Sequence, residues 1–106
     1  MHSECIKWER SAPRRGECDL RAGVQVIKDF PDPTGALETA YADFRAFLRS
    51  AGIPSGLYPV RTLLEPTGLR ETYRLVADHA GCRIMAGDTE GIRRGLVFLE
   101  DAILGA

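Results

Sequence analysis

Residues 71–104 read ETYRLVADHAGCRIMAGDTEGIRRGLVFLEDAIL and predict a β-hairpin followed by a helix. Apolar side chains alternate within residues 72–77 and 82–86, which is typical of strands with one buried face. Residues 78–81 (Asp-His-Ala-Gly) separate the two strands and are predicted to form the turn of the hairpin. The alternating side chains are those of Tyr73, Leu75, Ala77, Cys82, Ile84 and Ala86.

The helix after the hairpin is expected to begin with a cap at Asp88 or Thr89 and to run to about Leu104. Its main apolar stripe consists of Ile92, Leu96, Leu99 and Ile103. Val97, Phe98 and Leu104 project from other faces, so more of the circumference is apolar than one covered surface requires. We therefore predict a second packing surface at these three residues.

A second amphipathic helix is predicted upstream, between Thr34 and Gly52. Its stripe consists of Leu37, Ala40, Tyr41, Phe44, Phe47, Leu48 and Ala51. The charged residues Glu38, Asp43, Arg45 and Arg49 fall largely outside the stripe. The hydroxyl of Thr34 is expected to cap the start, and Gly52 is expected to end the helix in a left-handed conformation.

Three further strands complete the expected fold. Residues 57–65 predict a strand in which Pro59 favours an edge position or an irregular start. Residues 23–30 and 5–9 are rich in β-branched and aromatic side chains, although residues 1–20 are assigned to irregular structure or an edge strand. The class is α+β, with a mixed sheet of about four to five strands and two helices packed against it.

The length and composition of the chain predict a single domain, residues 1–106, with one core. A net charge of −1 provides no field that would gather phosphates, so no nucleic acid is predicted as a partner. No stretch is apolar enough for a membrane span, and the first residues lack the apolar run of a signal peptide. Three widely spaced cysteines suit a reducing compartment, so a cytoplasmic location is favoured.

The candidate reactive residues favour structural roles. His2 and His79 form no helical zinc motif and the cysteines form no close pair, so neither a metal nor a cofactor is predicted. His79 is expected in an exposed turn, and Cys82 is expected to be a small buried apolar residue. Glu100 and Asp101 diverge by about 100° around the helix and are expected to be solvated surface acids.

Gly91 and Gly95 lack the following lysine and hydroxyl residue of a phosphate-binding loop. Glycines at helical positions favour the close approach of another backbone instead. Because no nucleophile, base and orienting group converge in the sequence, no catalytic residue is predicted. The chain itself is therefore not expected to be an enzyme.

Residues 71–104 resemble the end of the zincin-like accessory domain that precedes the barrel in β-N-acetylhexosaminidases and related family 20 glycoside hydrolases. The matching features are the strand motif of Glu71, Tyr73 and Leu75, the return strand Gly-Cys-Arg-Ile-Met-Ala, and the Asp-Thr-Glu-Gly turn into a helix with Gly91, Gly95 and Leu99. The upstream helix before Ile53-Pro54 also suits the family, and the resemblance spans about residues 20–104.

This resemblance implies a parent glycoside hydrolase whose catalytic α/β barrel cleaves terminal N-acetylated hexosamines with an adjacent Asp-Glu pair. None of those catalytic residues maps onto this sequence. The expected function is a non-catalytic N-terminal accessory domain that supports the barrel through Val97, Phe98 and Leu104. The alternative is a stand-alone protein-binding or dimerisation module that uses the same apolar helix, by which the chain could also self-associate.

Overall fold

The structure is a computed structural model that describes residues 6–7, 18–20, 22–66 and 69–104. Two short strands pair in parallel near the N-terminus, and only Ile6–Lys7 of the predicted strand 5–9 lies within the described residues. The strands are β1 (Ile6–Lys7), β2 (Cys18–Asp19), β3 (Val24–Lys28), β4 (Tyr58–Leu64), β5 (Tyr73–Asp78) and β6 (Gly81–Ala86). The helices are α1 (Glu38–Ser50) and α2 (Thr89–Leu104).

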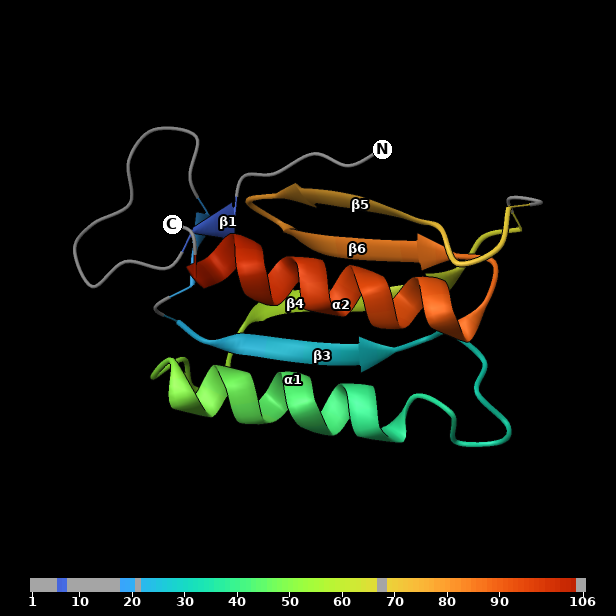
Figure 1. Cartoon of the computed structure of the whole chain (residues 1–106). Coiled ribbons are helices and arrows are strands. Elements are labelled where there is room, and N and C mark those ends of the chain that lie inside the picture. The colour runs from blue at the N-terminus through green and yellow to red at the C-terminus, as the bar shows by residue number, and fades with distance from the viewer. Residues whose placement is uncertain (1–5, 8–17, 21, 67–68, 105–106) are drawn as a thin grey trace.

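The main sheet has four strands in the order β3-β4-β6-β5. The β3–β4 and β4–β6 pairs are parallel, and β5 is antiparallel to β6. Both helices lie on the same side of the sheet and run in the same direction (Figure 1). These observations confirm the α+β class with a mixed sheet and two helices.

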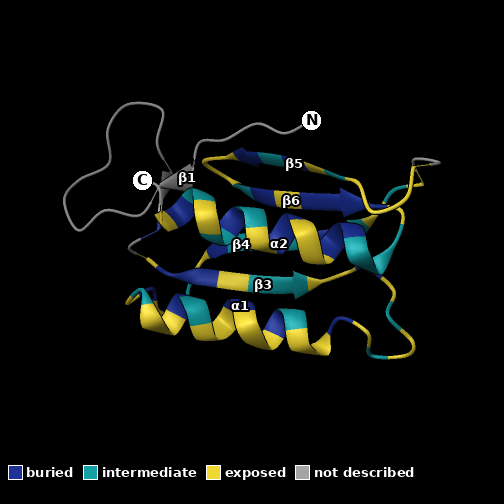
Figure 2. Ribbon diagram, in the orientation of Figure 1, coloured by how far each residue is buried: buried dark blue, intermediate teal, exposed yellow. Residues whose placement is uncertain are grey.

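The core lies between the sheet and the helix layer, as the burial pattern in Figure 2 shows. Strand side chains that point toward the helices meet the buried stripes of α1 and α2, so the predicted amphipathic faces are confirmed. The largest fully buried side chains include Phe44, Leu75, Ile84, Ile92, Leu96 and Leu99. The buried hydroxyl of Thr62 is satisfied by the hydroxyl of Tyr41 at 2.7 Å.

Strand β4 lies inside the sheet, so of the two alternatives predicted from Pro59 the edge position is wrong. The pairing of β4 with β6 begins at Val60 and Cys82, one residue after Pro59. The missing N–H of the proline therefore interrupts no hydrogen bond of that ladder. The ring packs closely on β6, because a Cβ added to Gly81 would lie 2.7 Å from its Cγ.

The start of β4 is irregular, as predicted, because the chain crosses β3 there. Gly56 lies directly against the backbone just before β3, where an added Cβ would be 1.7 Å from the carbonyl oxygen of Ala22. Gly23, with φ of 96°, adopts a conformation that favours glycine. Two residues without side chains thus allow the two backbones to cross in contact.

No side-chain hydrogen bond caps α1, whose N-cap residue is Leu37, so the prediction of a cap at Thr34 is wrong. Asp32 instead holds the turn that leads into the helix. The two carboxylate oxygens of Asp32 accept hydrogen bonds from the N–H groups of Ala36 and Leu37, at 2.9 and 2.8 Å. A carboxylate can satisfy two donors at once, whereas a hydroxyl offers a single oxygen. The predicted end of the helix is confirmed, since Gly52 follows it with φ of 78°.

Helix α2 is capped by Asp88, whose Oδ1 accepts from the N–H of Gly91 at 2.8 Å, as one of the two predicted caps. A Cβ added to Gly91 would lie 2.2 Å from the carbonyl oxygen of Thr72, which confirms the predicted close approach of a backbone. At Gly95 the close neighbour is instead a side chain, because an added Cβ would lie 2.5 Å from a methyl of Ile84. Both glycines seat α2 directly on the hairpin.

Candidate docking surface on the second helix

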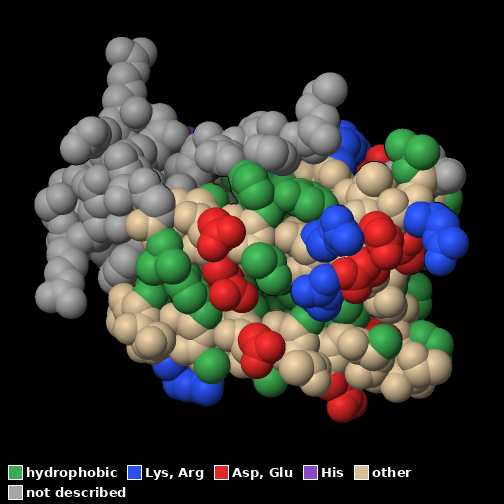
Figure 3. Space-filling model, in the orientation of Figure 1, with side chains coloured by type: hydrophobic (Ala, Val, Ile, Leu, Met, Phe, Trp, Pro, Cys, Tyr) green, Lys and Arg blue, Asp and Glu red, His purple; other side chains and the backbone are tan. Residues whose placement is uncertain are grey.

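The outer face of the C-terminal half of α2 carries exposed apolar side chains. Val97 is 45% exposed and Leu104 is 69% exposed. They lie seven residues apart, about two helical turns, and therefore project from the same side. Glu100 and Asp101 lie between them in the sequence, and Figure 3 shows apolar and acidic side chains mixed on this face of the molecule. We call Val97, Glu100 and Leu104 the outer patch.

Phe98 lies apart from the outer patch. Its side chain is half-buried against the core, and its ring centroid is 6.1 Å from that of Tyr73 on β5. Consecutive helical residues diverge by about 100°, so Phe98 projects toward β5 while Val97 projects outward. Of the three residues predicted as an interface, the structure brings Val97 and Leu104 together and places Phe98 at the flank.

Glu100 is less solvated than the sequence suggested. Burial raises the pKa of its carboxyl group above the ordinary value, and the neighbouring carboxylates of Asp43 and Asp101 raise the pKa further. None of the ion pairs between described residues includes Glu100. Asp101 is exposed, as expected. The outer patch therefore combines two apolar side chains with a carboxyl group that a nearby cation would stabilise.

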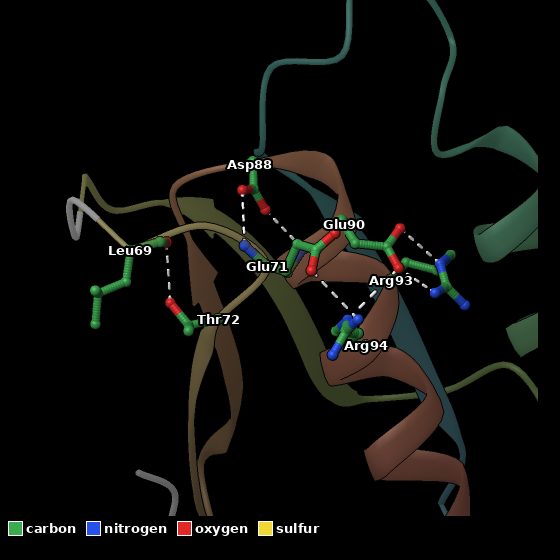
Figure 4. A network of polar contacts seen from close by, with 8 residues as sticks. Leu69, Glu71, Thr72, Asp88, Glu90, Arg93 and Arg94 are labelled. Atoms are coloured by element: carbon green, nitrogen blue, oxygen red, sulfur yellow. Dashed lines mark hydrogen bonds and ion pairs between the residues drawn. The ribbon is translucent and has the colours of Figure 1, made fainter.

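The N-terminal half of α2 carries a polar network instead, which Figure 4 shows. Glu90 accepts hydrogen bonds from the guanidinium group of Arg93 and forms an ion pair with Arg94. Arg94 also donates to Glu71 at 3.4 Å. Pairing with Arg93 lowers the pKa of Glu90 below its ordinary value. These charges are exposed and already paired, so this half of the helix is less suited to an apolar contact.

Asp88 joins this network to the loop before β5. Its Oδ2 accepts from the N–H of Glu71 at 2.9 Å. Hydrogen bonds from the backbone of Glu71 and of Gly91 lower the pKa of Asp88. Glu71 has a left-handed backbone with φ of 61°, which this bond helps to hold. The cluster fixes the start of α2, and every one of its carboxylates has a partner.

The exposure of His79 and the burial of Cys82, both in the hairpin, agree with the prediction. His79 is exposed in the β5–β6 turn, where Asp78 accepts from the N–H groups of Ala80 and Gly81 at 2.9 and 3.1 Å. Cys82 is 1% exposed, and burial raises the pKa of its thiol to about 12. A buried thiol with a raised pKa is protonated at neutral pH and is a poor nucleophile.

We expect the stability of the protein to fall as the pH rises from about 9 toward 12. The Cys82 thiol ionises near 9.0 in an unfolded chain and near 12 in the folded one, so its contribution is complete below pH 9 and is lost as the pH approaches the folded value. Burial also raises the pKa of Tyr58, which acts in the same direction. Urea unfolding at pH 8 and at pH 10.5 measures the change.

The matched control for this pH dependence is Cys82→Ala, which removes the titrating thiol. The variant should lose less stability than the parent chain between the two pH values, whatever its stability at pH 8. An equal loss in both proteins would contradict the role of Cys82. Replacing Cys5 and Cys18 by serine in both proteins removes the other thiols from the comparison.

The described residues hold no group of three or more His, Cys, Asp or Glu side chains arranged to bind a metal ion. Among the same residues, no helix combines the length and apolar character that crossing a bilayer would require.

Two surface hollows lie away from the outer patch. One, with a volume of about 560 Å³, lies between β3 and α1, and the other, about 270 Å³, lies beside Arg61 and Arg83 on the sheet face opposite the helices. Both depend on how distant segments pack, which no local pattern encodes. The only sequence signal for the larger hollow was Arg45 and Arg49, one turn apart outside the apolar stripe.

No protein-family model matches this chain, and neither a curated protein nor a solved structure matches it.

Proposed function

We propose that this chain is a non-catalytic accessory domain of a β-N-acetylhexosaminidase-like glycoside hydrolase and supports a catalytic α/β barrel. The observation that carries the proposal is the outer patch, where Val97 and Leu104 are exposed on a helix whose opposite face is fully packed. The choice of this family depends on the resemblance of the strand and helix motifs in residues 71–104 to its accessory domain. The zincin-like form of the fold belongs to the same proposal.

The outer patch suits a contact between domains of one protein. Burying an aliphatic side chain such as Val97 or Leu104 contributes roughly 1.5–3 kcal/mol. Covalent linkage supplies a high effective concentration, so a small apolar contact is enough to hold neighbouring domains together. Interfaces between domains of one chain are also more polar than permanent subunit interfaces, which suits the presence of Glu100 in the patch.

Glu100 specifies part of the partner surface. Its raised pKa means that burial already disfavours the carboxylate. An uncharged surface docked over Glu100 would increase the cost of desolvating its carboxylate. A lysine or arginine opposite Glu100 would offset that cost. We therefore infer a barrel surface with apolar side chains opposite Val97 and Leu104 and a basic side chain opposite Glu100.

The test measures whether the chain stabilises a separately expressed family 20 catalytic barrel. Adding the chain should raise the melting temperature of the barrel in a concentration-dependent way. The double variant Val97→Asp/Leu104→Asp should abolish the rise, because it introduces two charges into an apolar contact. The control Leu57→Asp/Leu69→Asp changes two side chains that are also exposed and should leave the rise unchanged.

An equal rise in the melting temperature of the barrel with both double variants would argue against the proposal. So would the absence of any rise when the unmodified chain is added. The chain alone should not hydrolyse an aryl N-acetyl-β-glucosaminide. Turnover that persists through purification and disappears on substitution of one of its own side chains would overturn the non-catalytic role.

The second candidate function is a dimerisation module that uses the same outer patch. It is favoured by the spacing of Val97 and Leu104, which repeats after seven residues as in helices that pair lengthwise. Sedimentation equilibrium of the chain, with Val97→Asp as the comparison, separates the two. A stable dimer that this substitution dissociates supports the module and weakens the accessory-domain proposal.

A further inference from the structure

A groove of about 560 Å³ separates β3 from the C-terminal half of α1. Val26 and Leu48 form apolar walls, residues 53–56 close one end, and the side chains of Arg45 and Arg49 line the groove from α1. Figure 1 shows α1 alongside β3 at the border of the sheet. The groove therefore follows the outer edge of β3, which pairs with only one other strand, β4, among those that the structure describes.

Backbone groups of β3 point into this edge. The N–H of Tyr58 on β4 donates to the carbonyl of Gly23 at 3.1 Å. That carbonyl and the N–H of Val24 belong to one peptide plane and point in opposite directions, so the N–H of Val24 points away from β4. Because the direction alternates along a strand, the N–H and C=O groups of Val26 and Lys28 also point outward.

The chain itself shows that this edge accepts a strand. The N–H of Val24 donates to the carbonyl of Pro54 at 2.9 Å, and the N–H of Gly56 donates to the carbonyl of Val24 at 3.3 Å. Val24 and Ser55 thereby form an isolated parallel bridge. After Gly56 the chain crosses to the β4 side, so in the described structure this segment pairs with Val24 and does not reach Val26.

The wall contributed by α1 is positively charged. Arg45 and Arg49 lie one turn apart, where like charges repel, and neither takes part in an ion pair between described residues. Asp29 and Asp32 lie between β3 and α1 in the sequence. Asp29 pairs with Arg61, and Asp32 accepts from backbone N–H groups in the turn before α1. A carboxylate entering the groove would therefore meet two guanidinium groups that form no ion pair with a described carboxylate.

We propose that this groove binds an extended acidic peptide segment, which adds as a strand to the outer edge of β3 and places carboxylates against Arg45 and Arg49. Main-chain hydrogen bonds to Val26 and Lys28 hold the peptide, and the arginines select its charge. A second copy of the chain is less suitable, because paired β3 edges would bring its own Arg45 and Arg49 to the same groove. The groove shares no residue with the outer patch. The peptide-binding proposal and the accessory-domain proposal can therefore be refuted independently of each other.

The test uses the full chain and a fluorescein-labelled peptide of alternating glutamate and valine, with a lysine–valine peptide of equal length for comparison. Fluorescence anisotropy should show saturable binding of the glutamate peptide only. The variant Arg45→Glu/Arg49→Glu should weaken that binding at least about tenfold. The control Arg70→Glu/Arg83→Glu changes the net charge equally, through exposed arginines outside the groove, and should change the affinity by less than about twofold.

Backbone pairing is tested with two further peptides, N-methylated at alternate amides in the two possible registers. Only the register that faces β3 should lose binding, because the other amides point to solvent. Circular dichroism confirms that the variants remain folded. The proposal is overturned by equal binding of the lysine peptide, by equal weakening in the two arginine variants, or by equal binding of both methylated peptides. Failure of the glutamate peptide to bind, with or without a dimer formed through this edge, also overturns it.

Discussion

Replacing Phe44 by alanine should lower the free energy of unfolding by about 4 kcal/mol. Its ring is 0% exposed and lies where α1 meets the sheet, among the largest fully buried side chains of the protein. The substitution removes the apolar contacts of the ring and leaves a cavity that close-packed neighbours fill only in part. Chemical denaturation monitored by circular dichroism measures the change.

Phe47 provides the matched control for this substitution. It is the same residue type on the same helix, its ring stacks against that of Phe44 with centroids 6.3 Å apart, and its side chain is only partly buried. We expect Phe47→Ala to cost about 1–2 kcal/mol, since less apolar surface returns to water. Equal losses in the two variants would show that the core is centred elsewhere on α1.

Gly91→Ala should destabilise the protein by about 3 kcal/mol, although alanine is the better helix former by about 1 kcal/mol. The added Cβ would lie 2.2 Å from the carbonyl oxygen of Thr72 and 2.7 Å from the Cβ of Ala86. Neither neighbour is the end of a flexible side chain, so α2 must move away from the hairpin. Thermal and urea unfolding of the variant measure the loss.

The control for Gly91 is Gly52→Ala at the end of α1. A Cβ there meets no atom within 4 Å, so the only cost is the left-handed backbone, about 1 kcal/mol. If Gly91→Ala were no more harmful than Gly52→Ala, the close seating of α2 on the hairpin would be refuted. Because α2 carries the outer patch, Gly91→Ala should also weaken the proposed contact with a catalytic barrel.

The candidate sites show which features local sequence can reveal. Val97 and Leu104 were predicted to be available for contact, because they fall outside the stripe of a helix whose period is plain in the sequence. Phe98 shares that property, yet its surroundings depend on Tyr73, which lies on a different strand. For the groove beside β3 the sequence offered only the spacing of Arg45 and Arg49, since Val26, Leu48 and Ile53 come together only after folding.

The sequence by itself determined the hairpin 72–86, the two amphipathic helices and the cap at Asp88. Each depends on side-chain periodicity or on hydrogen bonds between residues close in the chain, so spacing alone encodes it. Only the tertiary structure decided that β4 lies inside the sheet and that residues 54–58 cross the chain at Gly23, just before β3. Those features depend on contacts between residues more than 20 positions apart, whose partners no local spacing specifies.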